Sequence, residues 1–247
     1  MAADEYSGHE YNPDVRPAQQ RGVAGAVEFS APTPAIPRDF KTAFGERFLS
    51  TFHKGTMDYT YKGISCLKNP IDLVLYMKLI WELRPKTIIE IGSFRGGSAI
   101  FYADLCATYG LETRIITVDF RAIQEQGDSR VDFIQADALH LEESELHAAL
   151  ESLPRPWLVI EDSAHTNEVC HAVMIYFKDR LEPGEVLIIE DGVIEDQGAN
   201  AVYRGGPNLA VSRFFSEWPD CFRVMDEYTD FFGVNATFNP NGYLQKC

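Results

Sequence analysis

The chain has 247 residues, of which 45% are hydrophobic and 24% charged, a globular composition with enough material for one large α/β domain or two small ones. Its formal net charge is −15 at pH 7, which excludes a broad phosphate-binding surface and opposes non-specific nucleic-acid binding. Residues 1–38 are rich in Pro, Ala, Gly and Gln without an apolar period, and they predict a flexible arm before a single domain over residues 39–247.

Cysteine usage and the apolar runs indicate the compartment. The five cysteines are scattered and form no C-x-x-C pair, which is typical of free thiols in a reducing compartment. No secretory signal is visible at the N-terminus, and the longest apolar run, residues 73–81, is interrupted by Lys78 and too short to span a bilayer. We therefore expect a soluble cytoplasmic protein without a membrane or nucleic-acid partner, and a homo-oligomer stays open.

A helix is predicted at residues 69–84, after an irregular segment at residues 39–68 that suggests one short helix. Asn69 is a good N-cap, Pro70 suits the first helical position and Pro85 ends the helix. The helical period places four apolar residues on one face: Leu73, Met77, Ile80 and Trp81.

From residue 86 the chain alternates between strands and helices. Apolar runs predict strands at residues 86–92, 114–120, 131–137, 157–162 and 185–191. Helical spacing and acidic stretches predict helices at residues 96–110, 142–153, 166–181 and 206–218. Because the strands are apolar on both faces, we predict a mostly parallel α/β sheet covered on both sides. Two last strands, at residues 221–228 and 242–247, predict an antiparallel pair joined through a Phe-Asn-Pro-Asn-Gly turn.

The junction of the first long strand and its helix is rich in glycine. Glycines there let the backbone approach a ligand, while the helix N-terminus offers free N–H groups. The spacing is G-x-x-x-G-G, and Phe94 stands where dinucleotide binders have a middle glycine. The turn indicates either a cofactor site or a tight connection without a ligand. Its candidate cofactor-binding residues are Glu90, Gly92, Ser93, Gly96, Gly97 and Ser98.

Acids follow at the ends of the next two strands. Asp119 ends one strand where a carboxylate can accept both hydroxyls of a ribose, and Asp137, followed by Ala138, ends the next one close to where an adenine would lie. Ligands of open α/β sheets bind at the carboxyl ends of the strands. These residues leave NAD and S-adenosylmethionine as the candidate cofactors.

Two stretches read almost alike, LVIEDSAH at residues 158–165 and LIIEDGVIED at residues 187–196. If their strands are neighbours, Asp162, Glu190 and Asp191 leave the sheet at one edge, where parallel strands lie about 4.8 Å apart. Carboxylates that close repel each other unless a positive group lies between them. A hard divalent cation such as Mg²⁺ removes that conflict. The alternative is that Glu161 and Glu190 point to solvent or pair with an arginine or lysine, and that the repeat is chance.

Two further residues belong to this candidate site. His165 follows Asp162 by three residues and is a candidate general base or substrate contact, although a histidine there also suits a local hydrogen bond. Lys68, just before the predicted helix, is a residue that could reach the site. We assign the catalytic role to His165 and Asp162.

Five motifs, in order along the chain, carry a resemblance to a known family. They are YKGISCLKNPIDL, IIEIGSFRGGSAIFYAD, EDSAHTNEV, VLIIEDG and NPNGYLQK, which run from about Tyr61 to the C-terminus. Together they resemble the cephalosporin hydroxylase / rhamnosyl O-methyltransferase family, with Ala164 as a departure where relatives often carry an acid. The family is similar to class I S-adenosylmethionine-dependent methyltransferases. The resemblance therefore implies a Rossmann-like sheet of seven mostly parallel strands with a C-terminal antiparallel strand.

This resemblance also implies a function. It implies Mg²⁺-dependent methyl transfer from S-adenosylmethionine to a hydroxyl of a sugar or of a small molecule in secondary metabolism such as antibiotic biosynthesis. Gly92 and Ser98 would lie in the cofactor-binding turn, and Asp162, Glu190 and Asp191 would fall at the family's Mg²⁺ ligands. An NAD-dependent oxidoreductase and a hydroxylase-associated subunit on the same sheet are the alternatives.

Overall fold

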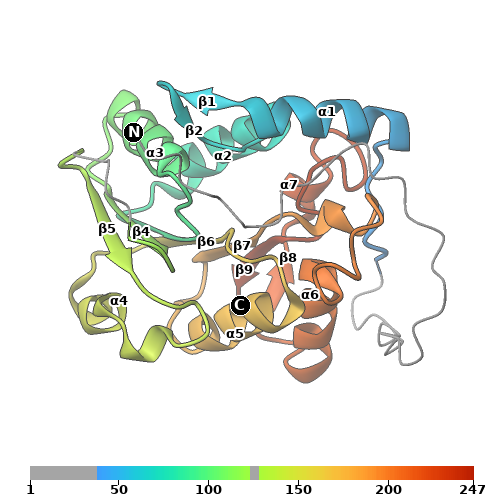
Figure 1. Ribbon diagram of the computed structural model, residues 1–247. Helices are drawn as coiled ribbons and strands as arrows, with labels where there is room; N and C mark the ends of the chain where they lie inside the picture. Colours follow the sequence, from blue (N-terminus) through green and yellow to red (C-terminus); the bar gives the residue numbers. More distant parts are fainter. Residues whose placement is uncertain (1–37, 123–127) are drawn as a thin grey trace. The chain divides into compact units, whose positions relative to one another are not determined.

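A seven-stranded sheet lies at the centre of the computed structural model, which describes residues 38–122 and 128–247 (Figure 1). In spatial order its strands are β5 (Val131–Gln135), β4 (Arg114–Asp119), β3 (Thr87–Ile91), β6 (Trp157–Glu161), β7 (Val186–Ile189), β9 (Tyr243–Lys246) and β8 (Phe222–Val224). The strands from β5 to β7 pair in parallel, whereas β9 runs antiparallel to both β7 and β8. The predicted α/β sheet with its C-terminal antiparallel strand is confirmed.

Helices cover both faces of this sheet (Figure 1). One face carries α2 (Pro70–Leu83) and α3 (Gly97–Thr108), and the other carries α4 (Glu145–Ala149), α5 (Asn167–Lys178) and α6 (Gly206–Glu217). The remaining elements are α1 (Glu46–Asp58), the hairpin of β1 (Thr60–Tyr61) and β2 (Ile64–Ser65), and α7 (Asp226–Thr229). Among the described residues, no helix has both the length and the apolar character needed to cross a bilayer.

The predicted N-terminal arm can be compared with the structure at one position only. Of residues 1–38, Arg38 alone is described, and its guanidinium forms an ion pair with Asp230 at 2.6 Å. The rest of the predicted arm lies outside the described residues. The described residues all belong to one compact unit, Ala31–Cys247. The boundary of the predicted domain at residue 39 stays a prediction.

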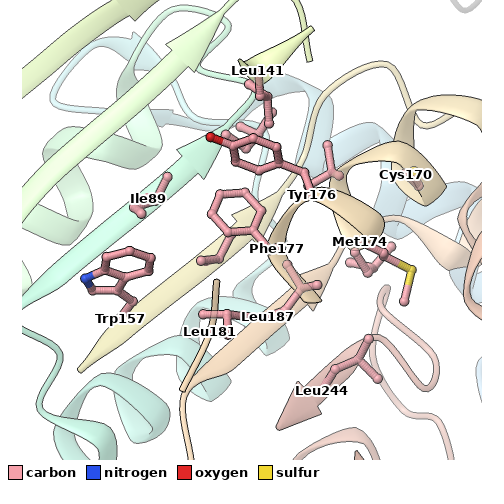
Figure 2. Packing of buried hydrophobic residues seen from close by; sticks show 14 of the residues in the cluster. Ile89, Leu141, Trp157, Cys170, Met174, Tyr176, Phe177, Leu181, Leu187 and Leu244 are labelled. Atoms are coloured by element: carbon pink, nitrogen blue, oxygen red, sulfur yellow. The ribbon is translucent and has the colours of Figure 1, made fainter. Parts of the chain in front are cut away.

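Alternate residues of each strand build two hydrophobic cores, one on each face of the sheet. On β3, Ile88 packs on the side of α2 and α3, whereas Ile89 packs on the side of α5 and α6. Figure 2 shows the second core, in which Met174 and Phe177 of α5 lie close to Leu187 of β7. Both faces of the sheet are therefore covered, and this is why its strands are apolar throughout.

Helix α2 forms as predicted, but only part of its predicted apolar face is buried: Ile80 is in the core and Leu73 packs against it. The Asn69 side chain caps it by accepting two backbone N–H groups at 3.0 Å, and Pro70 is in the first turn. Two residues of the predicted apolar face are exposed, Met77 by 40% and Trp81 by 55%. Apolar residues are spread around most of the helix, which carries only Asp72, Lys78 and Glu82 as charged residues, so its period does not single out the face that packs on the sheet. The residues it buries are Asp72, Leu75, Tyr76, Leu79 and Ile80.

Two other predicted elements are shorter than the sequence pattern indicates. The acidic helix predicted at residues 142–153 is reduced to α4 between two 3₁₀ turns, Leu141–Glu143 and Leu150–Ser152. Its break follows from Ser144, whose side chain accepts the N–H of His147 and so begins a new helix. The strand predicted at residues 221–228 ends at Val224, and α7 follows it.

Candidate functional site

The candidate site lies where the strand order reverses, between β3 and β6. From this point β4 and β5 continue in one direction and β7, β9 and β8 in the other, which is where ligands bind in open α/β sheets. Ile91 of β3 pairs with Glu161 of β6, and the N–H of Asp162 donates to the Ile91 carbonyl at 2.8 Å. Asp162 therefore leaves the sheet directly beside the glycine turn.

Two glycines of that turn are needed because other backbone segments approach them closely. Gly92 has a φ of +110°, and a Cβ there would lie 1.9 Å from the carbonyl oxygen of Asp162. A Cβ on Gly97 would lie 2.3 Å from the carbonyl oxygen of Ser65 in the β1–β2 hairpin. Gly96, also at positive φ, is the N-cap of α3. The turn is thus packed tightly against neighbouring backbone, and its part in binding a cofactor stays a prediction.

Glu90 of β3 is a fully buried acid beneath the turn. One of its oxygens, Oε2, accepts the Thr117 hydroxyl at 2.6 Å, and the other has no hydrogen-bond partner within the described part of the chain. Burial raises the pKa of Glu90 to about 7. Ser93 and Ser98 are buried beside it in the turn. The neighbouring Ser98 hydroxyl opposes part of this rise in the pKa of Glu90, and Glu90 as a cofactor-binding residue stays a prediction.

The two acids predicted at the following strand ends are partly engaged by their own loops. Asp119 accepts the N–H of Phe94 at 2.8 Å, which ties the glycine turn to the end of β4. Asp137 accepts the N–H of Leu139 at 2.9 Å, and this bond lowers the pKa of Asp137. Ala138 is partly buried against the core. Each carboxylate oxygen has two lone pairs, so these acids keep capacity for a ligand.

Asp162 and Glu190 share one ammonium group. The Lys68 Nζ lies 2.6 Å from Glu190 Oε1 and also donates to Asp162 Oδ2. The Tyr76 hydroxyl of α2 donates to the same Glu190 oxygen. Lys68 and Glu190 are only 3% and 4% exposed. The alternative considered for Glu190, pairing with a lysine, is therefore what the structure shows, and Asp162 shares the same lysine.

Burial away from water shifts the pKa values of Lys68 and Glu190. Burial opposes the charge on Lys68, but Asp162 and Glu190 outweigh it, so the pKa of the ammonium is well above its usual value. Burial raises the pKa of the Glu190 carboxyl well above its usual value, and the neighbouring Asp162 adds to this effect. Lys68 offsets only part of that rise.

A second group forms around the other oxygen of Asp162. The His165 Nε2 lies 3.9 Å from Asp162 Oδ1 and 3.5 Å from Asp191 Oδ2. One ligand atom from each of the three lies within 4.8 Å of the others, a spacing that could hold a metal ion. His165 and Asp191 have φ values of 53° and 59°. This left-handed backbone is uncommon in non-glycine residues, although residues away from the site such as Arg84 also adopt it.

Asp191 is held in that conformation by the C-terminal turn. The Asn239 Oδ1 accepts the N–H of Asp191 at 2.9 Å, and Asn239 is only 1% exposed. The N–H of Asn239 in turn donates to the Thr237 hydroxyl at 3.0 Å. The sequence singled out this segment as turn chemistry but not as a support for the site, because nothing local relates residue 239 to residue 191.

A family model described as Rhamnosyl O-methyltransferase/CmcI matches residues 53–247 of the chain. The chain belongs to this family. Rhamnosyl O-methyltransferases of Mycobacterium tuberculosis and Mycobacterium leprae are each 28% identical to it, over 195 and 193 residues. These matches cover 75% of this chain in both cases, and 77% and 82% of the two relatives.

Solved structures of CmcI have the same fold. An apo structure of CmcI has a TM-score of 0.61 at 28% identity, covering 77% of this chain and 76% of that one. A CmcI structure with Mg and SAM has a TM-score of 0.60 at 27% identity, covering 77% of both chains. The resemblance seen in the motifs is confirmed. It favours a methyltransferase over the NAD-dependent and hydroxylase-associated alternatives.

Proposed function

We propose that this protein transfers a methyl group from S-adenosylmethionine to a hydroxyl of a small molecule, with a sugar as the acceptor class, and that it requires Mg²⁺. One observation carries the proposal: Asp162, His165 and Asp191 meet at the carboxyl ends of β6 and β7, beside the glycine turn after β3. The names of the mycobacterial relatives support a sugar acceptor, and the ligands of the CmcI structure support the cofactor and the ion.

The residues at the reversal of strand order fit S-adenosylmethionine. The unpaired buried oxygen of Glu90 can accept a hydrogen bond from a ligand, and the N-terminus of α3 offers free N–H groups. Asp119 and Asp137, at the next two strand ends, would face the ribose and the adenine. When bound, the cofactor supplies an electrophilic methyl group on a sulfonium.

Asp162 and Asp191 are the residues that fit the ion, because Mg²⁺ takes carboxylate oxygens and keeps positions for water and substrate. When bound, Mg²⁺ supplies a Lewis acid that makes a nearby hydroxyl easier to deprotonate. Glu190 is a predicted third ligand, but Lys68 and Tyr76 engage it here. Glu190 stays part of the proposed site as its third carboxylate.

His165 would accept the proton that the acceptor hydroxyl loses. Its imidazole nitrogen is a poorer ligand for Mg²⁺ than carboxylate oxygen, and its Nε2 faces Asp162 and Asp191, whose charges would stabilise the protonated ring. The ring of Tyr203 meets the ring of His165 edge-on, with centroids 5.9 Å apart. This contact limits the positions open to the imidazole on that side.

The proposal is tested with methyl-labelled S-adenosylmethionine and a panel of rhamnosides and non-sugar phenols. We expect label on a sugar hydroxyl, loss of transfer in EDTA and recovery with Mg²⁺. Transfer that is unchanged in EDTA would reject the role of the metal. The cofactor is tested separately by calorimetric titration with S-adenosylhomocysteine, and absence of binding would reject it.

A further inference from the structure

We infer that Glu161 is a positioning residue of the site: its buried carboxylate holds the connection from β6 to α5, from which Asp162 and His165 reach the site. Glu161 is the last residue of β6 and directly precedes Asp162. Neither the proposed cofactor contacts nor the proposed ligands of the ion include it. The inference goes beyond the proposed function, and its consequence for metal affinity rests on the metal site proposed there.

Both oxygens of Glu161 accept hydrogen bonds from the segment that follows it. Oε1 accepts the N–H of Ser163 at 3.2 Å and also the Ser163 hydroxyl. Oε2 accepts the thiol of Cys170, in α5, at 3.0 Å. Burial and the charge of Glu161 raise the pKa of this thiol well above its usual value, so the thiol keeps its proton and stays a donor. One carboxylate therefore joins the start of the connection to the helix at its end.

The position of Glu161 is unfavourable for a carboxylate. The residue is 0% exposed, and its side chain points to the core of Figure 2, which contains Val159 and Cys170. Within residues 38–122 and 128–247, the hydrogen-bond donors to its oxygens come from Ser163 and Cys170, and neither is charged. A buried carboxylate without a cationic donor costs folding free energy. We therefore attribute the carboxylate to the geometry of the connection and not to stability.

Strand β3 contacts the same segment from its other side. The Asp162 N–H donates to the Ile91 carbonyl at 2.8 Å. A Cβ on Gly92 would lie 1.9 Å from the Asp162 carbonyl oxygen and 2.8 Å from the Ser163 Cα. The backbone at residues 162–163 thus lies between β3 and the Glu161 side chain. Removal of the carboxylate frees this segment on one side, while the bond between Asp162 and β3 persists.

Glu161→Met tests the inference, because methionine has a similar volume and is only a weak hydrogen-bond acceptor. We expect Mn²⁺, used as the probe in calorimetric titration, to bind at least about tenfold more weakly than to the wild type. Glu161→Gln keeps an oxygen for Ser163 but loses the charge, and its affinity should lie closer to that of the wild type. Ser163→Ala keeps the charge but loses the hydroxyl donor, and we expect about three- to tenfold weaker binding.

Glu185→Met is the matched control. Glu185 is also a buried glutamate, 2% exposed, but it lies just before the start of β7 and pairs with Arg155. Its loss should lower the urea midpoint without changing Mn²⁺ affinity. Amide hydrogen exchange of residues 162–166, measured in EDTA, gives a readout that needs no metal. It should be faster in Glu161→Met and Ser163→Ala than in the wild type, and unchanged in Glu185→Met.

The possible results separate this inference from the proposed function. Wild-type Mn²⁺ affinity in Glu161→Met overturns the inference, and so do equal losses in Glu161→Met and Glu161→Gln, because the charge alone then accounts for the effect. An equal loss in Glu185→Met overturns it as well. If Glu161→Met does not fold, Ser163→Ala decides, and wild-type affinity and exchange in that variant reject the inference. A wild type that binds no Mn²⁺ rejects the metal of the proposed function, and the exchange of residues 162–166 then decides the inference alone.

Discussion

Asp162 and Glu190 are neighbours because the two Ile-Glu-Asp stretches pair with their register shifted by one residue. Glu161 is opposite Ile189 in the register of β6 and β7, and the N–H of Glu190 donates to the Glu161 carbonyl. Since side chains alternate between faces, the two glutamates point to opposite sides of the sheet. Glu161 accepts from Cys170 of α5 at 3.0 Å, whereas Glu190 accepts from α2. A repeat in the sequence is therefore not a repeat in space.

A substitution at Asp162 tests the residue that both groups of the site share. We expect Asp162→Asn to lower methyl transfer by about 100-fold or more and to weaken Mn²⁺ binding, because an amide is a poorer ligand than a carboxylate. Transfer is measured with labelled S-adenosylmethionine and binding by calorimetry. Asp179→Asn, at an exposed surface acid, should leave both unchanged. Unchanged metal binding in Asp162→Asn would exclude this carboxylate as a ligand.

Glu90 predicts a dependence of stability on pH. Its pKa is about 7 in the folded protein and 4.5 as the usual value, so between these pH values the folded state binds the additional proton. Folding stability from this group is therefore full at low pH and falls as the pH rises through 7, by about 3 kcal/mol at most. Glu90→Gln should remove this fall.

The free energy of unfolding in urea, measured at pH 5.5 and pH 8 without cofactor, checks the prediction. The difference between the two pH values should be larger in the wild type than in Glu90→Gln. Glu112→Gln changes an exposed glutamate and should behave like the wild type. A wild type that gains stability relative to Glu90→Gln as the pH rises would contradict the prediction.

At the scale of the elements, the C-terminal turn at residues 238–242 packs against the segments that carry the site. Asp72 of α2 accepts the Tyr243 hydroxyl at 3.0 Å and the N–H of Phe238 at 3.0 Å, which joins the turn to the helix that carries Tyr76. A Cβ on Gly242 would lie 2.2 Å from the carbonyl oxygen of Ile189, at the end of β7. The turn is thus packed between α2 and the strand from which Asp191 emerges.

Asn239→Ala should disturb Asp191 without touching any predicted ligand. Loss of the bond to the Asp191 N–H leaves a donor unpaired, and we expect a loss of about 1–3 kcal/mol in stability together with weaker Mn²⁺ binding. Asn241→Gly is the control: it lies in the same turn at positive φ, and its amide donates to the Asp39 carbonyl at 2.7 Å instead. It should lose stability while keeping Mn²⁺ affinity. Equal loss of affinity in both variants would show that the turn acts only through folding.

Gly92 in the glycine turn can be compared with Gly110 after α3, because both have positive φ. Gly92→Ala puts a Cβ 1.9 Å from the Asp162 carbonyl oxygen, whereas at Gly110, also at positive φ, nothing lies within 4 Å. We expect Gly110→Ala to cost about 1 kcal/mol from backbone strain alone and Gly92→Ala to cost more than about 3 kcal/mol or to prevent folding. Urea unfolding measures both. Similar losses would mean that the approach of β6 is not what requires Gly92.

At the scale of the whole sheet, the reversal of strand order gathers residues that are far apart in the chain. Lys68, Asp162 and Asp191 come from the loop before α2 and from the ends of two neighbouring strands. The two cores hold these elements from opposite faces of the sheet. The strands that end at Asp162 and Asp191, β6 and β7, contribute residues to both of these cores.

Much of this arrangement could be predicted from local pattern. Strand and helix periods placed most elements, and the motifs identified the family. Met77 and Trp81 were wrongly assigned to the buried face of α2, because apolar residues are spread around most of this helix. The sequence did not decide whether Glu190 pairs with an ion or with a lysine, because no spacing along the chain relates residue 68 to residue 190.

The sequence by itself determined that acids end neighbouring parallel strands beside a glycine turn, because apolar runs and turn residues act locally and parallel strands end together. Only the tertiary structure decided which acids meet and what neutralises them. That outcome depends on the register of β6 and β7, shifted by one residue between the two similar stretches, and on the loop that buries Lys68 between their ends. Register and burial are set by packing between segments distant in the chain, and a one-residue shift is enough to move a side chain to the other face.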